Sequence, residues 1–149
     1  MDSSPAAGRK PQLRITRRYP VAPEKVWRAW TDPQALSAWF GPGGASVTQA
    51  EMDVRVGGRY TIAFRTSDGE QHRVSGVYEE VQAKRKLCFT WAWQSTPDRV
   101  SLVTIELRPA LDGTELKFRH DRFFDEAARA SHERGWTATL EKLEQFLQT

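Results

Sequence analysis

The chain has 149 residues, of which 39% are hydrophobic and 28% charged, and its formal net charge at pH 7 is +3. This length and apolar content suit one domain with a core of its own. The positive charge is small and forms no dense Lys/Arg stripe, so nucleic-acid binding is not expected. No run reaches the roughly 18 apolar residues that span a bilayer, so a membrane protein is not expected either.

The start of the chain differs in composition from the rest. Residues 1–11 are polar and rich in Ser, Pro and Ala, and we expect a flexible tail before a single domain over residues 12–149. This tail has no apolar segment typical of a signal peptide. Cys88 is the only cysteine, which rules out a disulfide within the chain. Together these features predict a cytoplasmic location.

Alternating apolar and polar side chains predict a first strand over residues 13–19, although Arg17 falls on the apolar side. Two short helices follow. Asp32 is the expected N-cap of the second helix, which begins at Pro33 and runs to about Trp39. The Gly-Pro-Gly sequence at residues 41–43 cannot continue a helix and should end it.

The middle of the chain is predicted to be antiparallel sheet. Alternation and turn residues place strands at residues 45–52, 59–65, 71–81, 87–94, 100–107 and 115–120. Gly57-Gly58 and Asp112-Gly113 are typical hairpin turns. The strand over 71–81 has a mixed pattern, which predicts a bulge near Gly76.

A long helix is predicted from about Asp125, its N-cap, to Leu147. Its apolar stripe consists of Trp136, Leu140, Leu143 and Leu147. Gly135 lies within this helix at a cost of about 1 kcal/mol relative to alanine, which a close backbone approach would explain. A run of strands bracketed by helices indicates an α+β domain in which this helix covers one face of the sheet.

Several motifs, in this order, resemble the AHSA1-like family, which is related to the C-terminal domain of the activator of Hsp90 ATPase. They lie at residues 26–33, 39–42, 51–60, 68–69, 76–78, 113–114 and 135–136. The family belongs to the START-like, or SRPBCC, superfamily, and the resemblance covers residues 12–148. It implies a helix-grip fold: a curved antiparallel sheet of six or seven strands around the long C-terminal helix, with two short helices after the first strand. It also implies a cavity between sheet and helix, with the loop over residues 39–44 as its expected cover.

Apolar walls with a few polar groups are typical of a ligand pocket. The predicted cavity residues are Arg17, Trp39, Phe40, Tyr60, Phe64, Tyr78, Phe89, Trp91, Phe118, His120, Trp136 and Leu140. Core packing is the alternative interpretation for the rings. An internal salt bridge or water is the alternative for the polar members, since buried polar groups need partners.

No catalytic residue, metal site or cofactor is assigned from the sequence. His120 has a side chain that can exchange a proton near neutral pH, but a structural role explains it as well. The three histidines lack a metal-ligand spacing, and no phosphate-binding loop or nucleophile elbow is present.

Three functions therefore stay open. The first, which we expect, is a non-catalytic module that binds a small hydrophobic ligand in the cavity. The second is a protein-interaction role resembling that of Hsp90 ATPase activators. The third is a small-molecule cyclase or hydrolase of the polyketide-cyclase type, with His120, Tyr60 and Tyr78 as acid or base, which only the likeness of fold supports. The sequence leaves open whether the protein is a monomer or a homodimer.

Overall fold

A computed structural model describes residues 10–149, and the described chain forms seven strands and three helices. In chain order they are β1 (Leu13–Tyr19), α1 (Pro23–Thr31), α2 (Pro33–Ser37), β2 (Ser46–Met52), β3 (Arg59–Arg65), β4 (Gln71–Gln82), β5 (Lys86–Trp93), β6 (Ser101–Ala110), β7 (Gly113–Asp121) and α3 (Glu126–Leu147). Most of the predicted tail, residues 1–9, lies outside the described residues.

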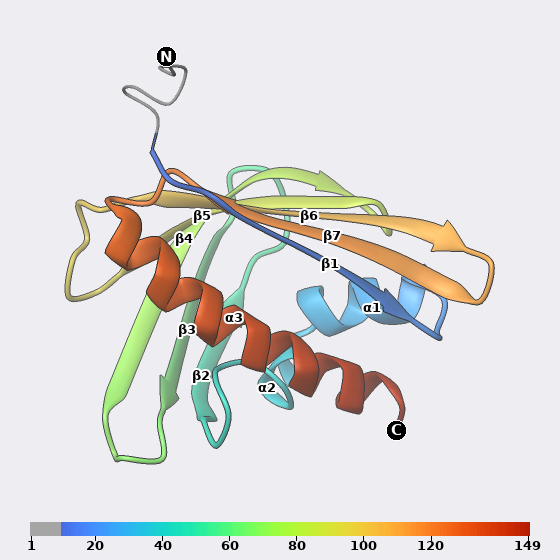
Figure 1. The fold of residues 1–149 in the computed structure, drawn as a ribbon, viewed down its shortest axis with the longest axis horizontal. Coiled ribbons are helices and arrows are strands. Elements are labelled where there is room, and N and C mark those ends of the chain that lie inside the picture. The colour runs from blue at the N-terminus through green and yellow to red at the C-terminus, as the bar shows by residue number, and fades with distance from the viewer. Residues whose placement is uncertain (1–9) are drawn as a thin grey trace.

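All seven strands form one antiparallel sheet in the order β1-β7-β6-β5-β4-β3-β2. Strands β2 to β7 follow one another as a meander, and β1 pairs with β7 at the far edge. Figure 1 shows the sheet curving around α3, with α1 and α2 beside the C-terminal half of that helix. The predicted helix-grip architecture, with its six or seven strands, is confirmed.

The apolar stripe of α3 is buried against the inner face of the sheet, as predicted. Leu140 and Leu143 are fully buried, and Leu147 is 1% exposed. Opposite them lie the inward side chains of the strands, including Phe118 of β7 and Ile105 of β6. Each large apolar side chain buried in this way stabilises the fold by about 1.5–3 kcal/mol.

Both predicted N-caps are confirmed. The Asp32 carboxylate accepts a hydrogen bond from the backbone N–H of Gln34 at 3.0 Å, and that of Asp125 accepts from Ala128 at 2.8 Å. Helix α2 ends at Ser37, earlier than predicted, because the next backbone N–H groups bond three residues back, as that of Trp39 does to Leu36.

At Gly76, β4 and β5 approach each other too closely for a side chain. A Cβ atom at this position would overlap the backbone carbonyl of Thr90. The side-chain hydroxyl of Thr90 also accepts a hydrogen bond from the Val77 N–H at 2.8 Å. The register shift lies between Tyr78 and Glu80, slightly beyond the predicted bulge. Gly76 therefore maintains strand spacing, and the bulge itself forms two residues further on.

We expect Gly76→Ala to lower the free energy of unfolding by about 1–3 kcal/mol, because the new methyl group forces β4 away from β5. Urea unfolding followed by circular dichroism measures this change. Ser75→Ala, at the exposed neighbouring position, is the control and should stay within about 0.5 kcal/mol of the parent. Equal unfolding midpoints for the two variants would contradict the role assigned to Gly76.

Candidate functional site

A pocket of about 670 Å³ lies between α3 and strands β3, β4 and β5, and we refer to it as the helix–sheet pocket. It is lined by Phe40, Gly41, Pro42, Phe64, Thr66, Gln71, His72, Arg73, Trp91, Trp93, Gln94, Ser95, Ser131, His132, Gly135, Trp136 and Thr139. This volume falls within the range of about 300–1,000 Å³ that is typical of small-molecule sites. The pocket is therefore large enough for an organic ligand with several rings.

Aromatic rings packed against one another form the walls of the helix–sheet pocket. The Trp91 and Trp136 ring centroids are 5.1 Å apart, and Phe40 meets the Trp136 ring edge-on at 6.0 Å. Phe64 stacks on His72 at 5.2 Å. Such tilted and edge-on contacts hold each ring in place. The pocket walls are therefore largely pre-formed.

Gly135 explains why α3 leaves space at this level. A Cβ atom at this position would meet no other atom within 4 Å, and Gly135 lines the pocket. The close backbone approach predicted from the sequence is therefore wrong. A helical glycine costs about 1 kcal/mol relative to alanine, and here no packing contact requires it. Its effect is to keep the pocket wall clear of a side chain.

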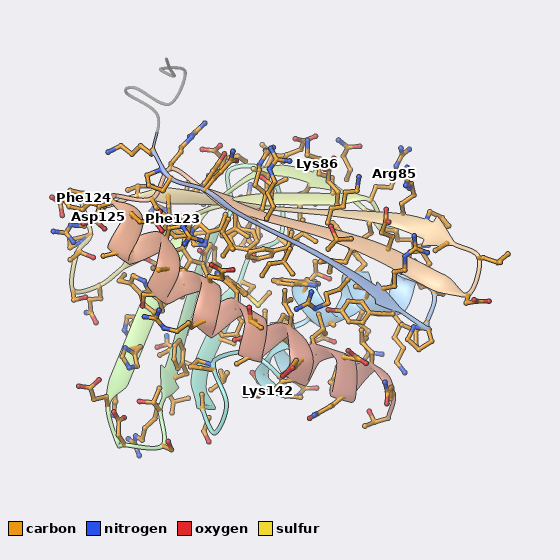
Figure 2. The ribbon with its side chains drawn as sticks, viewed as in Figure 1. Arg85, Lys86, Phe123, Phe124, Asp125 and Lys142 are labelled. Atoms are coloured by element: carbon orange, nitrogen blue, oxygen red, sulfur yellow. The ribbon has the colours of Figure 1, made fainter. Side chains whose placement is uncertain are left out.

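The loop after α2 is fastened to α3 by a lysine. Lys142 Nζ donates to the carbonyl oxygens of Gly41 at 3.1 Å and Pro42 at 3.2 Å. Figure 2 shows Lys142 on the side of α3 that faces α2. Burial lowers the pKa of this amine. Because Gly41 and Pro42 line the pocket, this contact holds one of its walls in position.

His120, the predicted acid–base candidate, is completely buried behind the pocket. Its Nδ1 atom accepts from the Trp136 indole N–H at 3.1 Å, and its Nε2 atom lies 2.7 Å from the Ser101 hydroxyl oxygen. An indole N–H can only donate, so Nδ1 is unprotonated and Nε2 donates to Ser101. The neutral imidazole therefore fixes the orientation of the Trp136 ring.

His132, which does line the pocket, is held in the same way. Its Nε2 atom accepts from the Trp93 indole N–H at 3.0 Å, so its Nδ1 donates to the Ala128 carbonyl oxygen at 2.7 Å. Two histidine–tryptophan pairs thus position rings around the pocket. Each pair requires a neutral histidine, since a protonated ring nitrogen cannot accept the indole hydrogen.

Burial keeps both histidines neutral. Desolvation lowers the pKa of His120 well below 6.5, and the neighbouring His132 lowers it further. Desolvation also lowers the pKa of His132, against the opposing effect of its hydrogen bond to Ala128. The physical cause is that a charged imidazole loses its hydration in the aromatic core.

The sequence-predicted cavity residues fall into separate places. Four of them line the helix–sheet pocket: Phe40, Phe64, Trp91 and Trp136. A second, much smaller space has a volume of about 10 Å³, and we call it the inner chamber. Of the predicted residues, it is lined by Tyr60, Tyr78 and Phe89, together with Phe40 and Trp91. Four others are buried but line neither space: Trp39, Phe118, His120 and Leu140.

Arg17 lines neither of these spaces. It is half-buried on β1, and its Nη1 atom donates to the Thr16 carbonyl oxygen at 3.1 Å. The cause is topological: β1 is an edge strand paired with β7, whereas the pocket lies over β3, β4 and β5.

The sequence analysis did not assign Trp93, His132 or Gly135 to the site. The sequence carried a signal for each of them. Trp93 shares the alternation phase of Trp91, and His132 lies one helical turn before Trp136, which places it on the same face of α3. Gly135 carried a signal as well, a helix-weakening residue beside a buried tryptophan.

A charged depression of about 940 Å³ lies elsewhere on the molecule, near the turn between β4 and β5. Arg85 and Lys86, which line it, project from the side of the sheet opposite α3 (Figure 2). Its basic walls are partly neutralised by ion pairs, such as Arg108 with Glu115 at 3.1 Å. This surface resembles an ordinary solvated face, so the helix–sheet pocket is the stronger candidate site.

Two further properties concern the described residues, 10–149. None of their helices is both long enough and apolar enough to cross a membrane. Nor do they place three or more His, Cys, Asp or Glu side chains together in a way that could hold a metal ion.

Comparison with known proteins identifies relatives of this fold. A family model described as activator of Hsp90 ATPase homolog 1-like protein matches residues 20–148. A search of curated proteins found no significant match.

Solved structures resemble the chain over most of its length. The AHSA1 protein from Silicibacter pomeroyi is 30% identical, with a TM-score of 0.84, and the match covers 93% of this chain and 98% of that one. A protein from Chromobacterium violaceum is 27% identical at TM-score 0.84, over 93% and 97% of the two chains. A third, from Nitrosomonas europaea, is 28% identical at TM-score 0.80, over 92% and 94%.

The two histidine–tryptophan pairs predict that stability falls as the solution is acidified. Below about pH 6.5 the unfolded chain protonates its histidines, whereas folded His120 and His132, with their lowered pKa values, stay neutral until a lower pH. The unfolded state then binds more protons. The free energy of unfolding should drop by up to about 1.4 kcal/mol per pH unit for each histidine. Urea unfolding between pH 7.5 and pH 5, values chosen to bracket about 6.5, measures the slope.

The pairing can be tested by replacing one histidine at a time. His120→Gln should remove a large part of this slope, whereas the control Gln94→Ala, on the pocket wall and without a titratable group, should leave it unchanged. An unaltered slope in His120→Gln would contradict the assignment of a neutral, buried imidazole.

Proposed function

Because the chain belongs to the family of activator of Hsp90 ATPase homolog 1-like proteins, we propose that it binds a small, mainly apolar molecule in the helix–sheet pocket. The observation that carries this proposal is Gly135, which keeps open a pocket wall that any larger residue would narrow. A helix under selection for stability alone would favour alanine there. A site that must stay open accounts for the glycine.

The pocket walls favour a ligand with flat rings. Trp91, Trp93 and Trp136 present aromatic surfaces, which pack well against other rings. Polar residues also line the pocket, among them Thr66, Gln94 and the cationic Arg73. Such a pocket binds its ligand through burial against the rings and uses the polar groups for orientation.

The state of the three side chains expected as acid or base, His120, Tyr60 and Tyr78, supports binding over proton transfer by these groups. His120 does not line the pocket, and both of its ring nitrogens are engaged, as are those of His132. The Tyr60 hydroxyl donates to the Thr90 carbonyl oxygen at 2.5 Å, and burial raises its pKa well above 10. Burial raises the pKa of Tyr78 in the same direction. A general acid or base needs a free, suitably tuned group facing the substrate.

Substitutions at Gly135 test the proposal directly. Gly135→Ala should raise the free energy of unfolding by about 0.5–1 kcal/mol, because alanine favours the helix and its methyl group meets no other atom. Gly135→Leu should leave the fold intact but occupy the pocket. The expected result is a graded loss of 1-anilinonaphthalene-8-sulfonate binding: Gly135→Ala binds the dye about two- to threefold more weakly than the parent, and Gly135→Leu at least about tenfold more weakly, a loss of about 1.4 kcal/mol.

The readouts are dye fluorescence for binding and circular dichroism for the fold. Leucine at a matched exposed helix position, Ala127→Leu, controls for a general effect of an added apolar side chain. Equal dye binding by Gly135→Leu and the parent would contradict the proposal that this pocket is the binding site.

The Lys142 contact should control how fast a bound molecule leaves. Lys142→Met removes a charged donor to the Gly41 and Pro42 carbonyls, a contact of about 1.5 kcal/mol, and frees that wall. We expect the dissociation rate of the same dye to rise by about tenfold in stopped-flow measurements. Lys25→Met is the matched control, since Lys25 Nζ also donates to two carbonyls, those of Leu147 and Thr149, at the end of α3. Similar rates for both variants would contradict this role.

A further inference from the structure

Two buried tryptophans differ from the others in their hydrogen bonding. Within residues 10–149, the indole N–H groups of Trp30 and Trp91 have no hydrogen-bond partner, although these residues are only 3% and 4% exposed. By contrast, the buried Trp39 indole donates to the Ala29 carbonyl oxygen at 3.1 Å. Burying a donor without an acceptor is unfavourable, and such donors are uncommon in folded proteins.

Trp30 and Trp91 both line the inner chamber. This chamber has a volume of about 10 Å³, which is enough for about one water-sized group. Phe40 and Trp91 also line the helix–sheet pocket, so the two spaces share these side chains as common walls.

The chemistry of the inner chamber selects for a neutral acceptor. Among the described residues, those that line it are apolar or aromatic and none carries a charge. A carboxylate or phosphate placed there would lose its hydration with no cation beside it, which is very unfavourable. A carbonyl oxygen, in contrast, needs only hydrogen-bond donors, and the two residues with unpaired indole N–H groups, Trp30 and Trp91, both line this chamber.

We propose that the inner chamber receives a neutral carbonyl group at the buried end of the ligand, accepting hydrogen bonds from the Trp30 and Trp91 indoles. The ligand class is then an aromatic ketone, quinone or related carbonyl compound whose rings fill the helix–sheet pocket. This inference rests on the proposed function and adds the identity of the buried polar group.

A pair of probes of equal shape tests it. 2-Acetylnaphthalene carries a carbonyl oxygen where 2-isopropenylnaphthalene carries a methylene group. Calorimetry of the parent protein should show the ketone binding about tenfold more tightly than the hydrocarbon, the gain expected from satisfying a buried donor. In ¹⁵N–¹H spectra the ketone, and not the hydrocarbon, should move the Trp30 or Trp91 indole signals downfield.

The preference should also depend on the indoles. Trp91→Phe and Trp30→Phe, each verified as folded by circular dichroism, should reduce the preference for the ketone while still binding the hydrocarbon. Trp39→Phe, whose indole is already paired, is the matched control and should retain it. Because the comparison of probes in the parent protein needs no variant, the test holds even if a substitution disrupts folding.

The outcomes separate the two proposals. If neither probe binds, the proposed function fails together with this inference. If both bind with equal affinity in the parent, or if the preference survives in both Trp30→Phe and Trp91→Phe, the pocket binds ligands but the assignment of a carbonyl to the inner chamber is overturned.

Discussion

The burial of α3 against the curved sheet is the contact on which the rest of the structure depends. Its C-terminal half closes the core, where Leu140 and Leu143 are completely buried. Its N-terminal half carries His132 and Gly135 and leaves the helix–sheet pocket open. One helix thus stabilises the domain at one end and forms a binding wall at the other. The glycine that weakens the helix lies where the pocket needs space.

Polar groups inside this aromatic core act mainly on the orientation of rings. His120 and His132 each accept an indole hydrogen and stay neutral because burial lowers their pKa values. In consequence Trp136 and Trp93 are held as fixed walls of a pre-formed pocket. Because these side chains are already ordered, less side-chain conformational entropy is lost when a ligand binds. The same burial that removes these histidines from proton transfer makes them effective structural partners.

The repetitive elements were predictable from sequence, whereas the site was predictable only in part. Period-two alternation placed Phe64 and Trp91 on the inner face, and helical spacing placed Trp136 there, because these patterns depend on local geometry. Whether an inward side chain fills the core or borders a pocket depends on the packing of distant elements. Arg17 therefore fell outside the pocket, and His132 was not assigned to it. Gly135 shows the limit most clearly, since its sequence context does not distinguish close packing from open space.

The most direct measurement of the central claim is native mass spectrometry of the protein purified gently from its own cells, compared with Gly135→Leu prepared in the same way. The account predicts a reproducible non-covalent adduct on the parent, of a size that fits a pocket of about 670 Å³, and a bare mass for the variant. The spectrum also reports whether the protein is a monomer or a dimer. An identical adduct on both proteins would place binding outside the helix–sheet pocket, and a bare parent would contradict the claim that the pocket holds a ligand in the cell.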